Sequence, residues 1–134
     1  MKTRIYALCL CLLVLPVAGC GPSGPETYPV SGTVTWNGDP LPEGNIVFEP
    51  VDGSIAPDAG KIAAGKFAFQ AQPGEKRVQI DATREVGEVD PVMHTVPREA
   101  YIPSKYNSAT ILTATVTADG ENDFTFELTE EGVE

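Results

Sequence analysis

Residues 30–44 read VSGTVTWNGDPLPEG, and this stretch decides the fold of the 134-residue chain. From Val30 to Trp36, apolar residues or glycine alternate with serine or threonine. A period of two is typical of a β-strand with one buried face. Asn37-Gly38 follows, and this dipeptide favours a type I′ turn because both of its residues accept positive φ angles. We therefore expect a strand that ends in a tight turn.

The same alternation returns along the rest of the chain in short segments separated by turn residues. Glycine, proline or aspartate interrupts the pattern near residues 65, 73 and 119. No window shows the apolar stripe of an amphipathic helix. The residues expected to face the core are Ile46, Phe48, Phe67, Phe69, Val78, Ile80, Ala82, Leu112, Ala114, Val116, Phe124, Phe126 and Leu128. About seven strands at this spacing predict an all-β chain folded as a β-sandwich, with a last hairpin at Asp119-Gly120.

The first residues indicate export. Lys2 and Arg4 form a short positive region, and the apolar stretch after them covers about ten residues, whereas a transmembrane helix needs about twenty. The sequence LPVAGC then ends at Cys20. Small residues directly before a cysteine resemble the lipobox of bacterial lipoproteins, in which the signal peptide is removed and the cysteine is acylated. We expect residues 1–19 to be a lipoprotein signal peptide and Cys20 to carry the lipid, with palmitate among its acyl chains.

The cysteine pattern agrees with this interpretation. Cys9 and Cys11 lie in the segment that would be removed, so Cys20 would remain alone and could form no internal disulfide. An ordinary secretory signal followed by a chance cysteine is the alternative. Residues 20–27, CGPSGPET, have the composition of a flexible tether. Residues 28–130 are then expected to form one domain.

The charge of the chain argues against one class of partner. The formal charge is −10, and it becomes −12 once Lys2 and Arg4 are removed. Binding to nucleic acid depends on basic contacts to phosphates, so we expect no nucleic-acid partner. We expect a monomer in the cell envelope, held to the membrane by its lipid. Gly21, the residue after the cysteine, favours the outer membrane or periplasmic face.

Three motifs resemble one known family. The V-x-G-x-V-x-W-x-G-x-P-L-x-x-G of residues 30–44 looks like the opening of carboxypeptidase regulatory-like domains. G-K-F-x-F at residues 65–69 and P-G-x-x-x-V-x-I at residues 73–80 are similar to that family's middle strands. The resemblance implies a seven-stranded prealbumin-like (transthyretin-like) β-sandwich with Greek-key connections over residues 28–130. In the carboxypeptidases this unit is accessory and a separate zinc domain is catalytic, so the resemblance implies no catalysis.

A second resemblance concerns the layout of the chain. A lipobox, a sandwich and the Y-I-P-x-K-Y-N of residues 101–107 together resemble small lipoproteins of planctomycete-type bacteria. This likeness implies a cell-envelope location and adds little about activity.

The segment 85–108 is the candidate binding loop. Loops of this length in compact domains are usually functional or disordered. Tyr101, Lys105 and Tyr106 could contact an envelope protein or a polysaccharide, because a tyrosine offers an apolar ring together with a polar group. The alternative is that the tyrosines and Ile102 fold back and cover one end of the sandwich.

The sequence contains no recognisable catalytic or cofactor motif. His94 is the single histidine, and a triad or a zinc site around it would need further partners. Asp119, Glu121 and Asp123 resemble a calcium loop in their spacing but supply too few ligands, so a charged hairpin tip is the simpler interpretation. We expect a non-catalytic binding or structural module without a cofactor. The alternatives are an accessory subunit that binds a small ligand, carbohydrate or calcium, and an enzyme.

Overall fold

The computed structural model describes residue 19 and residues 24–130. Most of the expected signal peptide and the expected lipidation site, Cys20, lie outside the described residues. The described chain is all-β, and no helix in it is long and apolar enough to cross a membrane. Its elements are β1 (Tyr28–Trp36), β2 (Asp39–Pro40), β3 (Glu43–Pro50), β4 (Asp58–Ala63), β5 (Lys66–Ala71), β6 (Gly74–Asp81), β7 (Thr83–Glu85), β8 (Arg98–Ala100), the 3₁₀ turn η1 (Ser104–Tyr106), β9 (Leu112–Val116) and β10 (Asp123–Leu128).

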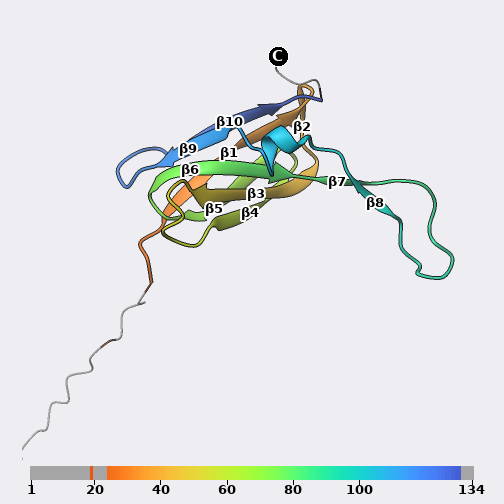
Figure 1. Ribbon diagram of the computed structural model, residues 1–134, viewed down its shortest axis with the longest axis horizontal. Coiled ribbons are helices and arrows are strands. Elements are labelled where there is room, and N and C mark those ends of the chain that lie inside the picture. The colour runs from red at the N-terminus through yellow and green to blue at the C-terminus, as the bar shows by residue number, and fades with distance from the viewer. Residues whose placement is uncertain (1–18, 20–23, 131–134) are drawn as a thin grey trace, which may run out of the picture.

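One curled sheet contains most of these strands. Their order is β10-β1-β5-β4-β3-β6-β9, with β2 paired to β1. All neighbours are antiparallel except β1 and β10, which run parallel. β4 and β5 pair through Ala63 and Lys66 alone in the described chain, so the sheet bends there and its two halves face each other (Figure 1). This arrangement is consistent with the predicted β-sandwich.

Strands β7 and β8 form a separate two-stranded ribbon. Figure 1 shows it projecting from the end of the sheet opposite to residues 24–27. We call β7, β8 and the residues between them the ribbon, and residues 86–97 the ribbon tip. Part of the segment predicted as a loop therefore has regular structure.

The turn predicted at Asn37-Gly38 is confirmed. The two residues have φ angles of 51° and 90°, so both occupy the left-handed region that the type I′ turn requires. The β4–β5 turn repeats this device at Ala64 and Gly65, with φ angles of 49° and 73°.

The predicted hairpin at Asp119-Gly120 is wrong. β9 pairs with β6 and β10 pairs with β1, so the chain crosses from one half of the sheet to the other between them. Asn122 organises this crossing, since its side chain accepts a hydrogen bond from the Thr117 N–H and donates one to the Thr117 carbonyl, both at 2.9 Å. An aspartate-glycine pair favours a turn, but it does not determine which strands pair on either side of it.

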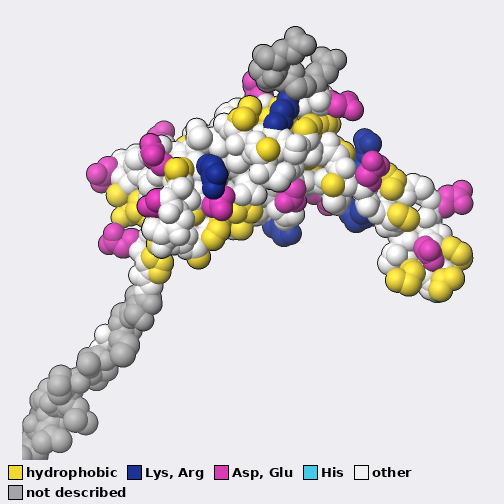
Figure 2. Space-filling model, viewed as in Figure 1, with side chains coloured by type: hydrophobic (Ala, Val, Ile, Leu, Met, Phe, Trp, Pro, Cys, Tyr) yellow, Lys and Arg dark blue, Asp and Glu magenta, His cyan; other side chains and the backbone are white. Residues whose placement is uncertain are grey.

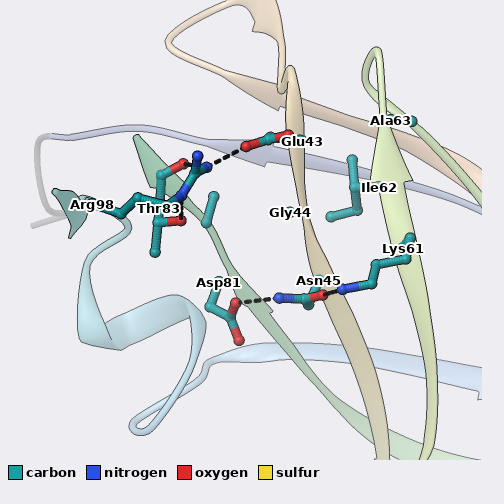
Figure 3. A pocket seen from close by; sticks show the side chains of 10 residues that line it. Glu43, Gly44, Asn45, Lys61, Ile62, Ala63, Asp81, Thr83 and Arg98 are labelled. Atoms are coloured by element: carbon teal, nitrogen blue, oxygen red, sulfur yellow. Dashed lines mark hydrogen bonds and ion pairs between the residues drawn. The ribbon is translucent and has the colours of Figure 1, made fainter. Parts of the chain in front are cut away.

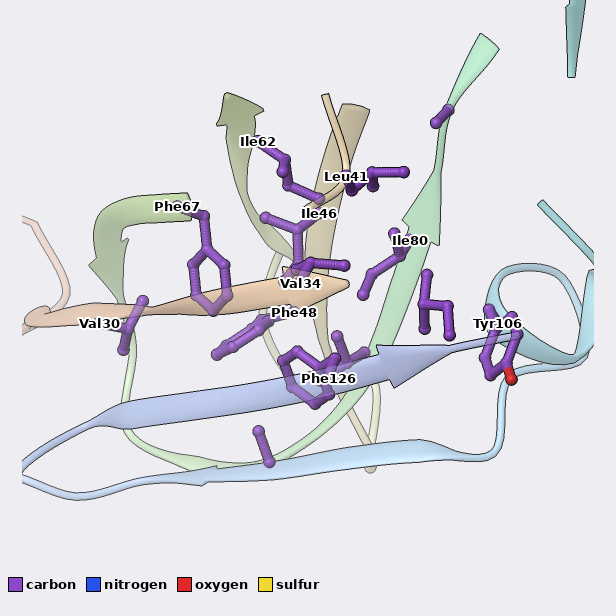
Figure 4. Packing of buried hydrophobic residues seen from close by; sticks show 14 of the residues in the cluster. Val30, Val34, Leu41, Ile46, Phe48, Ile62, Phe67, Ile80, Tyr106 and Phe126 are labelled. Atoms are coloured by element: carbon purple, nitrogen blue, oxygen red, sulfur yellow. The ribbon is translucent and has the colours of Figure 1, made fainter. Parts of the chain in front are cut away.

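The core lies between the two halves (Figure 4). Phe48 of β3 is fully buried, and its ring centroid lies 5.1 Å from Phe69 of β5 and 5.7 Å from Phe124 of β10. Gly32 lets β1 lie close to the backbone of β10, because a Cβ at this position would lie 1.9 Å from the Phe124 carbonyl oxygen. The buried hydrophobic residues are Val30, Val34, Leu41, Ile46, Phe48, Ile62, Phe67, Ala71, Val78, Ile80, Ala82, Ile102, Tyr106, Ala114, Val116, Phe126 and Leu128.

One lysine also faces the core. Lys76 precedes Val78 and Ile80 in the alternation of β6, and its side chain is 1% exposed. Its Nζ lies 4.0 Å from Asp58 Oδ2 and has no hydrogen-bond partner among the described residues. Asp58 in turn accepts a hydrogen bond of 2.8 Å from the backbone N–H of Gln72. Asp58 is therefore the counter-ion that makes the burial of Lys76 tolerable.

Removal of the two partners should have opposite consequences. Asp58→Ala should lower the free energy of unfolding by about 3–5 kcal/mol, because it leaves the Lys76 charge buried without a counter-ion. Lys76→Met should be neutral or stabilising by about 1–4 kcal/mol, since it removes the buried charge and keeps most of the volume. Urea denaturation measures both, with the exposed Glu127→Ala as the control. Equal losses in the two variants would contradict this ion pair.

Candidate functional site

A polar groove of about 440 Å³ lies across β3, β4 and β6 at the base of the ribbon (Figure 3). Strand register builds it, because Asn45 of β3 stands opposite Lys61 of β4 on one side and Asp81 of β6 on the other. The Asn45 amide donates to Asp81 Oδ1 at 2.9 Å, and Asn45 Oδ1 accepts from Lys61 Nζ at 2.6 Å. A neutral amide thus joins a cation and an anion in one row.

Arg98 of β8 closes the other end of the groove. Its guanidinium donates to Thr83 Oγ1 at 2.9 Å and to the Thr83 carbonyl at 3.1 Å, and it forms ion pairs with Glu43 and Glu85. The ion pair with Glu43 fastens the ribbon to β3 of the sheet, whereas the bonds to Thr83 and Glu85 join β8 to β7. Since the charged groups of the groove already bind one another, a ligand would have to displace bonds that exist.

The predicted loop residues Lys105 and Tyr106 lie together at one end of the core. Tyr106 is 3% exposed, and its hydroxyl oxygen accepts a hydrogen bond of 3.1 Å from the Thr129 N–H. Burial tends to raise the pKa of Tyr106, but the hydrogen bonds from Thr129, together with the hydrogen bond and positive charge of Lys105, outweigh it and lower that pKa below its usual value. The Lys105 ammonium lies 4.7 Å from the ring centroid. Tyr106 is thus buried in packing, together with Ile102.

Tyr101 lies apart from that pair, at the base of the ribbon. Its ring meets Trp36 edge to face at 5.5 Å, and the Arg84 guanidinium lies 5.3 Å from the ring centroid. Partial burial raises the pKa of Tyr101. The three predicted residues therefore do not line one groove, and of the three Tyr101 borders a surface depression, which it shares with Arg84 and Arg98.

The ribbon tip presents apolar side chains that the sequence analysis did not single out. Val89, Val92 and Met93 are 58%, 81% and 71% exposed. Figure 2 shows hydrophobic side chains gathered at the end of the projecting ribbon, beside acidic ones. The signal in the sequence was the presence of Val89, Val92 and Met93 among turn-forming and charged residues, in a segment free of strand alternation.

Asp90 gives the ribbon tip a defined shape. Its Oδ1 accepts hydrogen bonds from the backbone N–H groups of Val92 and Met93 at 2.7 and 2.8 Å. The backbone of Asp90 also bonds to Thr95 and His94 across the turn. These bonds from Met93 and Val92 lower the pKa of the Asp90 carboxyl. The exposed apolar side chains are consequently held by an ordered turn.

The other candidate residues stand alone. His94 lies in the ribbon tip with a φ angle of 55°, and its side chain is exposed. Asp119 and Glu121 are exposed in the crossing between β9 and β10, and Asp123 is exposed as the first residue of β10. No group of three histidine, cysteine, aspartate or glutamate side chains in residues 24–130 is placed to hold a metal ion.

The Asp90 turn should be sensitive to acid. Because the pKa of Asp90 is lowered in the folded chain, the turn is stabilised above the ordinary aspartate range and loses this stabilisation as the pH falls through the lowered pKa. ¹⁵N relaxation of the Val92 and Met93 amides should show increased motion at low pH. Asp90→Asn keeps an acceptor without a titrating group, so its turn should stay ordered in acid, and Asp90→Ala should be mobile at every pH. Identical acid responses in the wild type and Asp90→Asn would refute this role.

The described surface thus offers a groove of mutually bonded polar groups and an ordered ribbon tip with exposed apolar side chains. No protein-family model, curated protein or solved structure matches the chain.

Proposed function

We propose that the protein is a non-catalytic, lipid-anchored lipoprotein of the cell envelope whose β-domain is a binding module. The observation that carries this proposal is the ribbon tip, where Val89, Val92 and Met93 are exposed on an ordered turn. Exposed apolar patches on ordered elements are typical of interaction sites. The proposed partner is a protein of the envelope, because apolar side chains gain more from an apolar pocket than from a hydrated polysaccharide.

The polar groove is a weaker candidate for the contact surface. A ligand there would compete with the bonds among Lys61, Asn45 and Asp81, and it would have to separate Arg98 from Glu43. The exposed side chains of Val89, Val92 and Met93 at the ribbon tip have no polar bonds that a partner would have to displace.

The fold and the location proposed here go together. We propose a seven-stranded prealbumin-like sandwich with Greek-key connections, in which β10, β1 and β5 form one layer and β4, β3, β6 and β9 the other. The strand order and the single pair that joins β4 to β5 support this division. Residues 20–27 would serve as the tether to lipid on Cys20, most simply at the outer membrane.

The anchor can be tested by metabolic labelling with palmitate. The wild-type chain should incorporate the label, and Cys20→Ser should lose it, because the thiol is the acylated group. Cys11→Ser is the matched control and should keep the label, since Cys11 would be removed with the signal peptide. Label that persists in Cys20→Ser would refute lipidation at this residue.

The contact surface can be tested by photo-cross-linking in intact envelopes. A photoreactive residue in place of Val92, at the ribbon tip, should give a discrete adduct with a protein. The same residue in place of Thr113, which is exposed on β9, should not. Equal adducts from the two positions, or none from position 92, would contradict binding through the ribbon tip.

A further inference from the structure

We propose that the ribbon tip docks onto a second copy of the same chain, in a shallow depression on the outer side of β1 and β5. This inference rests on the proposed function, since it names the partner of the ribbon tip. The two surfaces lie on different parts of the domain and are complementary in apolar character and charge.

The first surface combines apolar side chains with negative charge. Val89, Val92 and Met93 are exposed, and the two charged side chains between Gly87 and His94 are Glu88 and Asp90. The Asp90 hydrogen bonds already order the turn. Little conformational entropy is therefore lost when such a tip binds.

The second surface is a depression of about 420 Å³, which we call the Lys66 depression. Ala68 is its exposed apolar side chain, Gly32 and the 4%-exposed Phe67 form its floor, and Lys61 and Lys66 contribute basic groups. Asp123 is its one acidic residue. An apolar depression with two lysines is complementary to an apolar tip with two carboxylates.

The two lysines of this depression differ from the other basic residues of the described chain, because neither is paired with a carboxylate or an aromatic ring. The other basic residues already have partners: Arg77 pairs with Glu49, Arg98 with Glu43 and Glu85, Lys76 with Asp58, Arg84 lies on Tyr101, and Lys105 lies on Tyr106. Lys66 has no hydrogen bond or ion pair within residues 24–130, and Lys61 bonds only the neutral Asn45. In a protein with a net charge of −10, these two ammonium groups form the most favourable place for an acidic segment.

The other depressions suit the ribbon tip less well. The depression between Pro50 and Lys76 also contains Asp52 and Glu75, which would repel Glu88 and Asp90. The polar groove is occupied by its own hydrogen bonds. Of these three depressions, the Lys66 depression matches both properties of the ribbon tip.

When one tip docks per pair, the contact is heterologous, and the pair keeps one free tip and one free depression. Repetition would produce a row of copies rather than a closed symmetric dimer. A contact built from three apolar side chains is small and therefore weak in free solution. Attachment of both copies to one membrane raises their effective concentration and makes a weak contact sufficient.

The test uses disulfide trapping with the full-length lipoprotein in its own envelope. Two differently tagged copies are expressed together, one with Val92→Cys at the ribbon tip and one with Ala68→Cys in the Lys66 depression. Mild oxidation should link the two tags. A single chain that carries both substitutions should give a ladder of multimers, as head-to-tail contacts require.

Two comparisons make the result decisive. Val92→Cys paired with Thr113→Cys should give about tenfold less linked product or lower, because random collisions do not bring those residues together. Lys66→Glu should reduce the 92–68 product by about tenfold, because it sets like charges against each other, and Glu88→Lys in the other copy should restore it.

Several outcomes would overturn the inference. Equal 92–68 and 92–113 products, a dominant 92–92 product, or no 92–68 product at all would each exclude the proposed contact. A photo-adduct of position 92 with a different protein, without 92–68 disulfides, would also overturn it while leaving the proposed binding function intact. Loss of adducts from position 92 altogether would instead contradict the proposed function itself.

Discussion

The structure depends on contact between aromatic rings of the two halves of the curled sheet. β4 and β5 share one residue pair in the described chain, so backbone hydrogen bonds do little to hold the halves together. Phe48 supplies that link, because its ring meets those of Phe69 and Phe124 from the opposite half. Such pairs contribute about 0.5–1.5 kcal/mol each beyond the area they bury. Gly32 permits this close approach, since any larger residue would collide with the backbone of β10.

The segment after the ribbon completes the core, and this determines how the ribbon is displayed. Ile102 and Tyr106 are buried, and Tyr101 packs on Trp36, so the chain is attached to the domain directly after β8. Arg98 attaches it again through its ion pair with Glu43 of β3. The base of the ribbon is therefore fixed to the domain, and the direction in which the ribbon projects is determined by the folded domain. An apolar group at the end of such a ribbon is presented in a defined direction.

Local patterns predicted the strands well, and long-range pairing escaped them. Alternation identified the inward residues of β6 and β10, and the Asn37-Gly38 turn followed from backbone preference. Nothing in Asp119-Gly120 indicates that β9 and β10 join different neighbours, because pairing depends on which half of the core each strand covers. The alternation of β6 also places Lys76 on the buried face, where Asp58 lies beside its ammonium group as counter-ion. For the site, the sequence singled out the segment 85–108, which contains the proposed ribbon tip, and emphasised its packed end, because tyrosine suits burial and recognition equally.

The distribution of apolar and basic side chains links stability to recognition. In the segment 85–108 the aromatic residues pack against the core. Val92 and Met93 are mostly exposed and therefore contribute little to the packing of the described domain. Most basic groups likewise neutralise nearby carboxylates or lie on rings, and Lys66 is left outside both arrangements. Apolar exposure favours unspecific association unless an ordered turn and local charge restrict the choice of partner. Asp90 provides the first restriction by bonding the tip backbone, and together with Glu88 it provides the second. The Asp90 carboxylate thus orders the backbone of the ribbon tip, and its negative charge also favours a basic surface on the partner.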